Sequence, residues 1–361
     1  MADRKRIGIL RADNHGLIYG AAWDIYDRYE FHLAHGQLYI LEYTTPYMPV
    51  LPLRDTQVTG VWDYPLPEDQ KDRVRLTANQ FAKAFHCKVY DDYHDMADPA
   101  LFDGVFIANC SFFAEDHLEL AMPFIKAGVP VFLDKPIADN AKNCKEILDA
   151  AREYNTPVMG TSILMYTDAN KEMLKENLGD PRLIVSTFAS SITRRNASVH
   201  TLSACLGPLM TLKGDYEIVS MQYIGGGKGL MPAEEKPERD GGAWEVYRVR
   251  FKDDTVGILN CNTHNCYEFR MDVYGTNGIS TKFVTEPTMR GAIADIAGQF
   301  AKMIDTRVPP LHYDRIFEFV AALDACDLSR AEGGREVSIK EIADSVGYEL
   351  YRPMPAGKEE K

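Results

Sequence analysis

The chain has 361 residues, 45% of them apolar and 26% charged, a balance typical of a folded globular protein with room for two domains. Its formal net charge of -13 argues against a nucleic-acid or anionic-membrane surface, because phosphate recognition needs basic patches. No apolar leader follows the basic N-terminal residues and no apolar stretch reaches about 20 residues, so we expect a cytoplasmic protein. Seven scattered cysteines predict reduced thiols rather than a disulfide framework.

Strand and helix patterns alternate through the first part of the chain. After a short apolar strand at 7–10, apolar runs bounded by turn residues predict strands at 57–63, 104–110, 129–135 and 156–162. Helical spacing occupies the intervening segments 69–85, 115–128 and 140–154. Strands that alternate with helices over short connections form a parallel sheet through right-handed crossovers. Residues 1–162 are therefore predicted to form a doubly wound α/β domain.

Longer strands joined by hairpin turns dominate after residue 181. The segments 182–192, 216–225, 244–264 and 268–278 have strand character, and Asp253-Asp254 and Asn277-Gly278 supply turn residues. A run of such strands predicts a mostly antiparallel sheet, so residues 163–361 are expected to form an α+β domain. Two helical stretches, 290–306 and 313–332, are expected to pack on that sheet or to return to the first domain.

The segment 102–140 carries the most informative motif. An apolar strand, a helix led by His117 and a second strand end in Asp134-Lys135-Pro136. This order closely resembles the Gfo/Idh/MocA family of NAD(P)-dependent oxidoreductases, in which the last motif reads Glu-Lys-Pro. The resemblance continues in MDVYGTNG (271–278) and in the closing helical segment 304–339, so it covers most of the chain.

The resemblance implies a fold and an activity. The expected fold is a Rossmann-type doubly wound parallel sheet followed by a C-terminal α+β domain with an open, mostly antiparallel sheet. The expected activity is NAD(P)-dependent hydride transfer at a carbinol carbon of a sugar, inositol or related polyol. The family also implies a homo-oligomer through the C-terminal sheet, with a small-molecule partner rather than a nucleic acid or a membrane.

Catalysis needs a group that handles the hydroxyl proton, because a hydride leaves a carbinol carbon only as that proton departs. Lys135, at the end of a predicted parallel strand, is the first candidate; a surface lysine is the alternative interpretation. In the family a D-x-G-x-H segment opens a helix, and here His200 remains while Asn196 takes the Asp position. An amide cannot accept a proton, so Lys135 and His200 would carry it and Asn196 would orient the substrate. Arg194 and Arg195 are candidates to bind an anionic substrate group.

The opening loop departs from the family's dinucleotide fingerprint. Aligned on the first strand, Arg11, Asp13 and Gly16 take the three positions of G-x-G-x-x-G. The first glycine allows a tight turn and the second lets backbone N–H groups approach the pyrophosphate. Asp13 adds bulk and negative charge there, which predicts weakened binding that Arg11 partly offsets. The remaining cofactor-site candidates implied by the resemblance are Asn109, His117, Asp134 and Pro136.

The acidic residue that selects the adenosine ribose is expected about 20 residues after the glycines. The strand 57–63 instead ends at Asp63, so the segment 30–55 reads as an insertion that forms a lid, an oligomer contact or part of a pocket. An alternative register makes 37–43 the second strand with Glu42 as the acid. We prefer Asp63 because the sequence after it continues as the family does. A carboxylate there slightly favours NAD over NADP, since it repels a 2′-phosphate.

A metal site and two other functions are the alternatives to this interpretation. Cys261, His264 and Cys266 superficially suggest zinc, but strand alternation sends Cys261 to the opposite face from the other two and no fourth ligand is apparent. We therefore expect no metal and treat His264 as a candidate substrate contact. The alternative functions are a sugar- or partner-binding protein that has lost its dinucleotide, and a lyase, hydrolase or epimerase that uses a tightly held NAD transiently.

Overall fold

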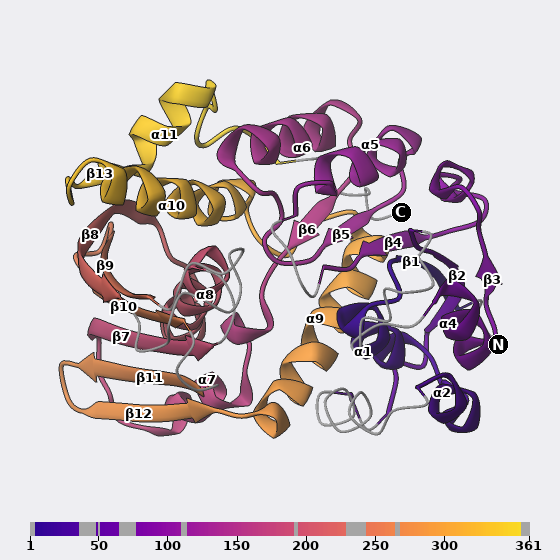
Figure 1. The fold of residues 1–361 in the computed structure, drawn as a ribbon, viewed down its shortest axis with the longest axis horizontal. Helices are drawn as coiled ribbons and strands as arrows, with labels where there is room; N and C mark the ends of the chain where they lie inside the picture. The colour runs from indigo at the N-terminus through magenta and orange to yellow at the C-terminus, as the bar shows by residue number, and fades with distance from the viewer. Residues whose placement is uncertain are drawn as a thin grey trace.

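The structure is a computed structural model that describes residues 4–35, 48–49, 51–64, 77–109, 114–190, 194–228, 243–263 and 268–354. Within these ranges the chain forms two sheets, one at each end of the molecule, with helices packed around and between them (Figure 1). Among the helices of the described ranges, none combines the length and the apolar character needed to cross a membrane.

The first sheet is parallel throughout, with the strand order β3-β2-β1-β4-β5-β6. Its central strands are fully buried, as expected for a parallel sheet covered on both faces. From β1 the chain adds β2 and β3 on one side and then β4, β5 and β6 on the other side. This reversal between β1 and β4 creates a crevice at their carboxyl ends. The strands are β1 (Lys5–Leu10), β2 (Thr56–Trp62), β3 (Lys88–Val89), β4 (Gly104–Ile107), β5 (Val131–Leu133) and β6 (Val158–Gly160).

Helices cover both faces of this sheet. In Figure 1, α1 and α4 lie on one side of it and α5 and α6 on the other. The capping box of Thr77 and Gln80 fixes the start of α4, so the helix predicted at 69–85 is seen from Ala78 onward, and 65–76 lie outside the described residues. The helices are α1 (Asn14–Trp23), α2 (Arg28–His35), α4 (Ala78–Phe85), α5 (His117–Ala127) and α6 (Ala141–Glu153), with a 3-10 turn η1 (Tyr93–Met96).

The insertion predicted at 30–55 is described only in part. Glu42 lies outside the described residues, as does most of this segment. On the side of β1 away from β4, the parallel partner strand is β2, which ends immediately before Asp63. Asp63 therefore occupies the position at the end of the second strand that the sequence favoured.

The second sheet has the order β12-β11-β7-β10-β9-β8-β13 and is antiparallel except for the β7–β10 pair. Asp254 adopts a left-handed φ of 63° in the β9–β10 turn, as its predicted turn role requires. Helix α8 (Arg194–Lys213) packs on one face of β7, β10 and β11. The strands are β7 (Pro181–Ser190), β8 (Ile218–Lys228), β9 (Ala243–Phe251), β10 (Val256–Thr263), β11 (Glu268–Gly275), β12 (Ile279–Val284) and β13 (Val337–Ser338). The predicted fold class is confirmed.

The closing helices connect the two sheets. Helix α9 (Glu286–Thr306) runs back to α1, where the indole N–H of Trp23 donates to the carbonyl of Ala297 at 3.3 Å. Helix α10 (Tyr313–Ala331) packs between β8 and α6, and α11 (Ile339–Val346) contacts the same two elements. Between β6 and β7 the chain forms η2 (Ile163–Met165), α7 (Asp168–Glu172) and η3 (Met173–Lys175). The end of the chain thus fixes the first sheet against the second.

Candidate active site

The candidate site lies at the carboxyl ends of the central parallel strands. The loops after β1, β4 and β5 carry Arg11, Asn109 and Lys135, which meet at the crevice where the strand order reverses. Parallel α/β sheets bind ligands at this position, because side chains and helix N-termini from several strands converge there. Most sequence-predicted residues of the first sheet are brought together here.

Asp134 is the anchor of the site. Its Oδ2 atom lies 2.5 Å from His15 Nδ1 and accepts the backbone N–H of Asn109 at 2.9 Å, while Oδ1 accepts the backbone N–H of Lys135 at 2.7 Å. Burial alone would raise the pKa of the Asp134 carboxyl, but His15 and Lys135 outweigh burial and lower that pKa. Asp134 is therefore a fixed, buried anion that ties β1, β4 and β5 together.

Lys135 and His200 approach each other from the two halves of the molecule. Lys135 follows β5 and is only 4% exposed. His200 lies on α8, the helix that follows β7 of the second sheet in the chain. Burial lowers the pKa of His200 well below its usual value, and the charges of Lys135 and His15 lower this pKa further. His200 therefore lies within electrostatic range of both Lys135 and His15.

His200 is held by aromatic rings rather than by an acid. Its ring packs against Phe188 and Phe269 with centroid distances of 4.8 and 5.7 Å. Its Nδ1 atom is fully buried and finds no hydrogen-bond partner within the described ranges. Because its pKa is lowered, His200 is a neutral imidazole at physiological pH, suited to hydrogen-bond a ligand rather than to carry a charge.

The opening loop keeps the backbone shape that a glycine would adopt. Arg11 has a left-handed φ of 75° and donates its N–H to the carbonyl of Trp62 at 2.7 Å. A Cβ atom on Gly16 would lie 2.2 Å from the Arg11 carbonyl oxygen, so the third glycine is required by close packing. The tight turn of the fingerprint is thus retained with an arginine in it, at a cost of about 1–3 kcal/mol for a non-glycine residue.

The side chain of Arg11 crosses the crevice. Its guanidinium donates to the carbonyl of Ala108 at 2.5 Å and pairs with Asp116, whose Oδ2 also accepts the hydroxyl of Tyr64 at 2.9 Å. The Arg11 ion pair outweighs burial and lowers the pKa of Asp116, whereas burial and Asp116 raise the pKa of Tyr64 to about 12. Sequence reasoning missed Asp116 and Tyr64, because nothing in their spacing links them to the fingerprint.

Two carboxylates each accept a hydrogen bond from one backbone N–H group of the loop. Asp13 caps α1, with Oδ1 accepting the N–H of Gly16 at 2.9 Å, and Asp63 Oδ2 accepts the N–H of Ala12 at 2.9 Å. An N-cap carboxylate satisfies the same orphan donors and helix dipole that a phosphate uses. At this helix start Arg11 therefore supplies positive charge to an approaching anion, and Asp13 supplies negative charge.

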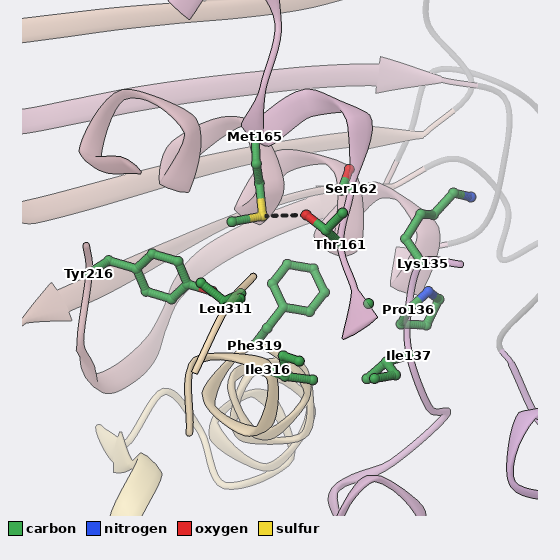
Figure 2. A pocket seen from close by; sticks show the side chains of 11 residues that line it. Lys135, Pro136, Ile137, Thr161, Ser162, Met165, Tyr216, Leu311, Ile316 and Phe319 are labelled. Carbon is green, nitrogen blue, oxygen red and sulfur yellow. Dashed lines mark hydrogen bonds between the residues drawn. The ribbon is translucent and has the colours of Figure 1, made fainter. Parts of the chain in front are cut away.

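His117 and Pro136 support the site from behind. His117 is fully buried at the start of α5, with Nδ1 3.1 Å from the carbonyl of Ile137, and burial together with Arg11 lowers its pKa to about 4. Pro136 lines a mostly apolar cavity of about 310 Å³, its open mouth included, together with Tyr216 and Phe319. Figure 2 shows the Lys135 amino group pointing away from these apolar side chains, so the side chains that line the cavity form an apolar wall behind Lys135.

Several predicted residues are outside the described part. Arg194, Arg195 and Asn196 open the backbone of α8, but their side chains are not described, and His264 lies in the gap 264–267. Within the described ranges no group of three or more His, Cys, Asp or Glu side chains is arranged to hold a metal ion. His15, which contacts Asp134, is a further residue of the crevice that the sequence did not single out.

The strand order, the crevice and the Lys135 position define a Rossmann-type nucleotide-binding sheet joined to a second, mostly antiparallel sheet. Residues 50–161 match the family model described as "Oxidoreductase family, NAD-binding Rossmann fold", that of Gfo/Idh/MocA. Over this region of the chain, the resemblance to the Gfo/Idh/MocA family inferred from the sequence is confirmed.

Relatives of known name match parts of the chain. An inositol 2-dehydrogenase/D-chiro-inositol 3-dehydrogenase of Lactiplantibacillus plantarum is 29% identical over 129 residues, 35% of this chain and 33% of the relative. A trans-1,2-dihydrobenzene-1,2-diol dehydrogenase of Oryctolagus cuniculus is 27% identical over 220 residues, 56% of this chain and 63% of the relative. The matched regions thus span about a third to two thirds of these relatives' lengths.

The fold is shared with solved structures over nearly the whole chain. A scyllo-inositol dehydrogenase from Lactobacillus casei with bound NAD(H) and scyllo-inositol aligns with a TM-score of 0.65 and 15% identity, covering 94% of this chain and 100% of that one. At this level of identity, the likeness supports the architecture.

Proposed function

We propose that the protein is an NAD(P)-dependent oxidoreductase that transfers a hydride at a carbinol carbon of an inositol, a sugar or a related polyol. The observation that carries this proposal is the position of Lys135 after β5, at the crevice of a Rossmann sheet and within electrostatic range of His200 on α8. The three relatives named above are dehydrogenases, two of them acting on inositols by name, and they do not favour a binding-only protein or a lyase.

The chain offers residues that fit a dinucleotide. The N-terminus of α1 and the Arg11 guanidinium would meet the pyrophosphate, with Arg11 exchanging Asp116 for phosphate oxygens. Asp63 would face the adenosine ribose, which favours NAD over NADP. A bound nicotinamide supplies the hydride acceptor, while Lys135 stabilises the developing alkoxide and His200 hydrogen-bonds the substrate hydroxyl.

The same proposal assigns a role to each of the two domains and a location to the protein. Residues 1–162 bind the dinucleotide and residues 163–361 supply the substrate side, including Asn196, Arg194, Arg195 and His264. We propose a cytoplasmic location.

The experiment that tests the activity presents myo-inositol, scyllo-inositol and open-chain polyols with NAD⁺ or NADP⁺ and follows the reduced nicotinamide by absorbance. Turnover of at least one polyol supports the proposal, and inactivity with the whole panel contradicts it.

The second sheet supports a homo-oligomer. Its face opposite α8 exposes the large apolar side chains of Trp244, Tyr274, Ile279 and Phe283, from β9, β11 and β12. Phe283 alone is 52% exposed. Exposed apolar groups gathered on one sheet face are typical of a surface that is covered by a partner, and a second copy of the chain is the partner that the family resemblance implies.

Replacing Phe283 by aspartate is expected to dissociate the oligomer. A charge on this face would be buried without a partner in the assembly, which costs several kcal/mol. Size-exclusion chromatography with light scattering should give a multiple of the 40.7 kDa chain mass for the native protein and a single chain for Phe283→Asp. The matched control is Leu174→Asp, which is also exposed but lies in η3, away from this face. A native monomer would contradict the proposed assembly.

A further inference from the structure

His15 lies at the centre of the crevice. It occupies the first turn of α1, next to Gly16, and its Nδ1 atom contacts Asp134 Oδ2 at 2.5 Å. The imidazole is 13% exposed and the carboxylate 3%, so the contact is shielded from water. The two residues come from the ends of β1 and β5, which brings a His–Asp pair to the point where substrate chemistry is expected.

The Asp134 carboxylate determines which nitrogen of His15 acts as a base. Asp134 is fixed by the N–H groups of Asn109 and Lys135, and its lowered pKa keeps it ionised. An ionised carboxylate only accepts hydrogen bonds, so His15 must donate through Nδ1–H. Its Nε2 atom then carries the lone pair that can accept a proton, as in other His–carboxylate pairs.

Among the described candidate bases of the crevice, His15 is paired with a carboxylate, whereas His200 is held by aromatic rings. The lowered pKa of His200 makes it the weaker proton acceptor, and the amide of Asn196, at the position where the family motif has an acid, cannot accept a proton. In the proposed function, Lys135 has the separate role of stabilising the alkoxide. The titratable groups described around His15 include Asp134, which it contacts, Lys135, whose charge acts on Asp134, and His200 from α8.

We propose that His15, oriented by Asp134, accepts the proton of the substrate hydroxyl in the proposed oxidation. The O–H bond breaks and its proton moves to Nε2 of His15. The C–H bond breaks with its electron pair, which leaves as hydride to NAD(P)⁺, the oxidant, and the carbinol becomes a carbonyl. This inference rests on the proposed function and adds to it a proton acceptor.

The direct test replaces His15 by asparagine, whose amide N–H can still donate to Asp134 but whose side chain has no basic nitrogen. We expect kcat to fall by about 100-fold or more, the acid limb of the pH profile of kcat/KM to disappear, and NADH affinity measured by calorimetry to change by less than about threefold. The matched control is His86→Asn, at an exposed histidine that ends α4 in a left-handed conformation asparagine tolerates. It should leave turnover within about twofold.

A second readout is independent of bound cofactor. Nitrogen NMR of histidine-labelled native protein should show His15 titrating with the Nδ1 proton retained, and Asp134→Asn should move its midpoint to lower pH by at least one unit, a tenfold loss of proton affinity. His15→Gln guards against a folding defect of the first variant, with thermal unfolding checked for each. If the native protein turns over substrate and the pH profile of kcat/KM is unchanged in His15→Asn, this inference alone is overturned. The same holds if Asp134→Asn leaves the NMR titration of His15 unchanged. Absence of native turnover overturns the proposed function, and this inference with it.

Discussion

Replacing Lys135 by methionine is expected to lower kcat by about 1000-fold, while NADH affinity stays within about threefold. Lys135 is 4% exposed at the end of β5, and methionine retains much of its length while removing the ammonium group. A cation that faces a developing alkoxide acts mainly in the transition state, so its loss lowers kcat rather than ground-state binding. Proton-handling and electrostatic groups of this kind typically contribute 10²–10⁴-fold, about 3–5 kcal/mol.

Steady-state kinetics on the polyol identified by the panel provides the measurement. Lys126→Met is the matched control, because this lysine is exposed at the end of α5 and should tolerate the change. Lys135→Arg retains the charge but replaces a compact ammonium by a planar guanidinium, so it should recover only part of the rate. A Lys135→Met enzyme with native kcat would exclude Lys135 from the chemistry.

Trp23→Ala is expected to cost about 3–5 kcal/mol of unfolding free energy, the range for a large buried aromatic. Trp23 has no exposed surface and its ring lies 5.5 Å from Phe106 and 5.6 Å from both Tyr19 and Phe300. Its indole also donates to Ala297 in α9, so the substitution opens a cavity where the closing helices meet the first sheet.

Urea denaturation followed by far-ultraviolet circular dichroism measures this loss without relying on the deleted fluorophore. Ile25→Ala, two residues further on and 74% exposed, is the matched control and should change stability by less than about 0.5 kcal/mol. Trp23→Phe should fall between them, because a smaller ring keeps part of the aromatic contact. A loss below about 1 kcal/mol for Trp23→Ala would mean that this cluster does not hold the two parts together.

The parallel sheet could be predicted from the sequence because its strands are continuous apolar runs between helical segments. β4, β5 and β6 fall inside the runs at 104–110, 129–135 and 156–162, each shorter than the run because the last residues leave the sheet as loops. Those loop residues are the ones that form the site. Lys135 was recognisable for the same reason, since a polar residue after a buried strand has few structural roles.

The polar contacts of the crevice could not be predicted in the same way. His15 and Asp134 are 119 positions apart, and a lone histidine in a loop has no spacing that identifies its partner. The sequence predicted that the negative charge of Asp13 weakens dinucleotide binding, and the structure adds the role of Asp13 as the N-cap of α1. An aspartate three residues before Gly16 at a helix start is an N-cap signature, so that role was available from the pattern.

The central claim is that the altered opening loop still binds a nicotinamide dinucleotide, and calorimetric titration of the nucleotide-stripped protein with NADH and NADPH tests it most directly. We predict micromolar binding, tighter for NADH than for NADPH. Asp13→Ser keeps a capping side chain but removes the charge, and should bind about tenfold more tightly, whereas Arg11→Ala should bind at least tenfold more weakly. No binding by the native protein, with binding restored in Asp13→Ser, would contradict the claim and identify the loop as a disabled cofactor site.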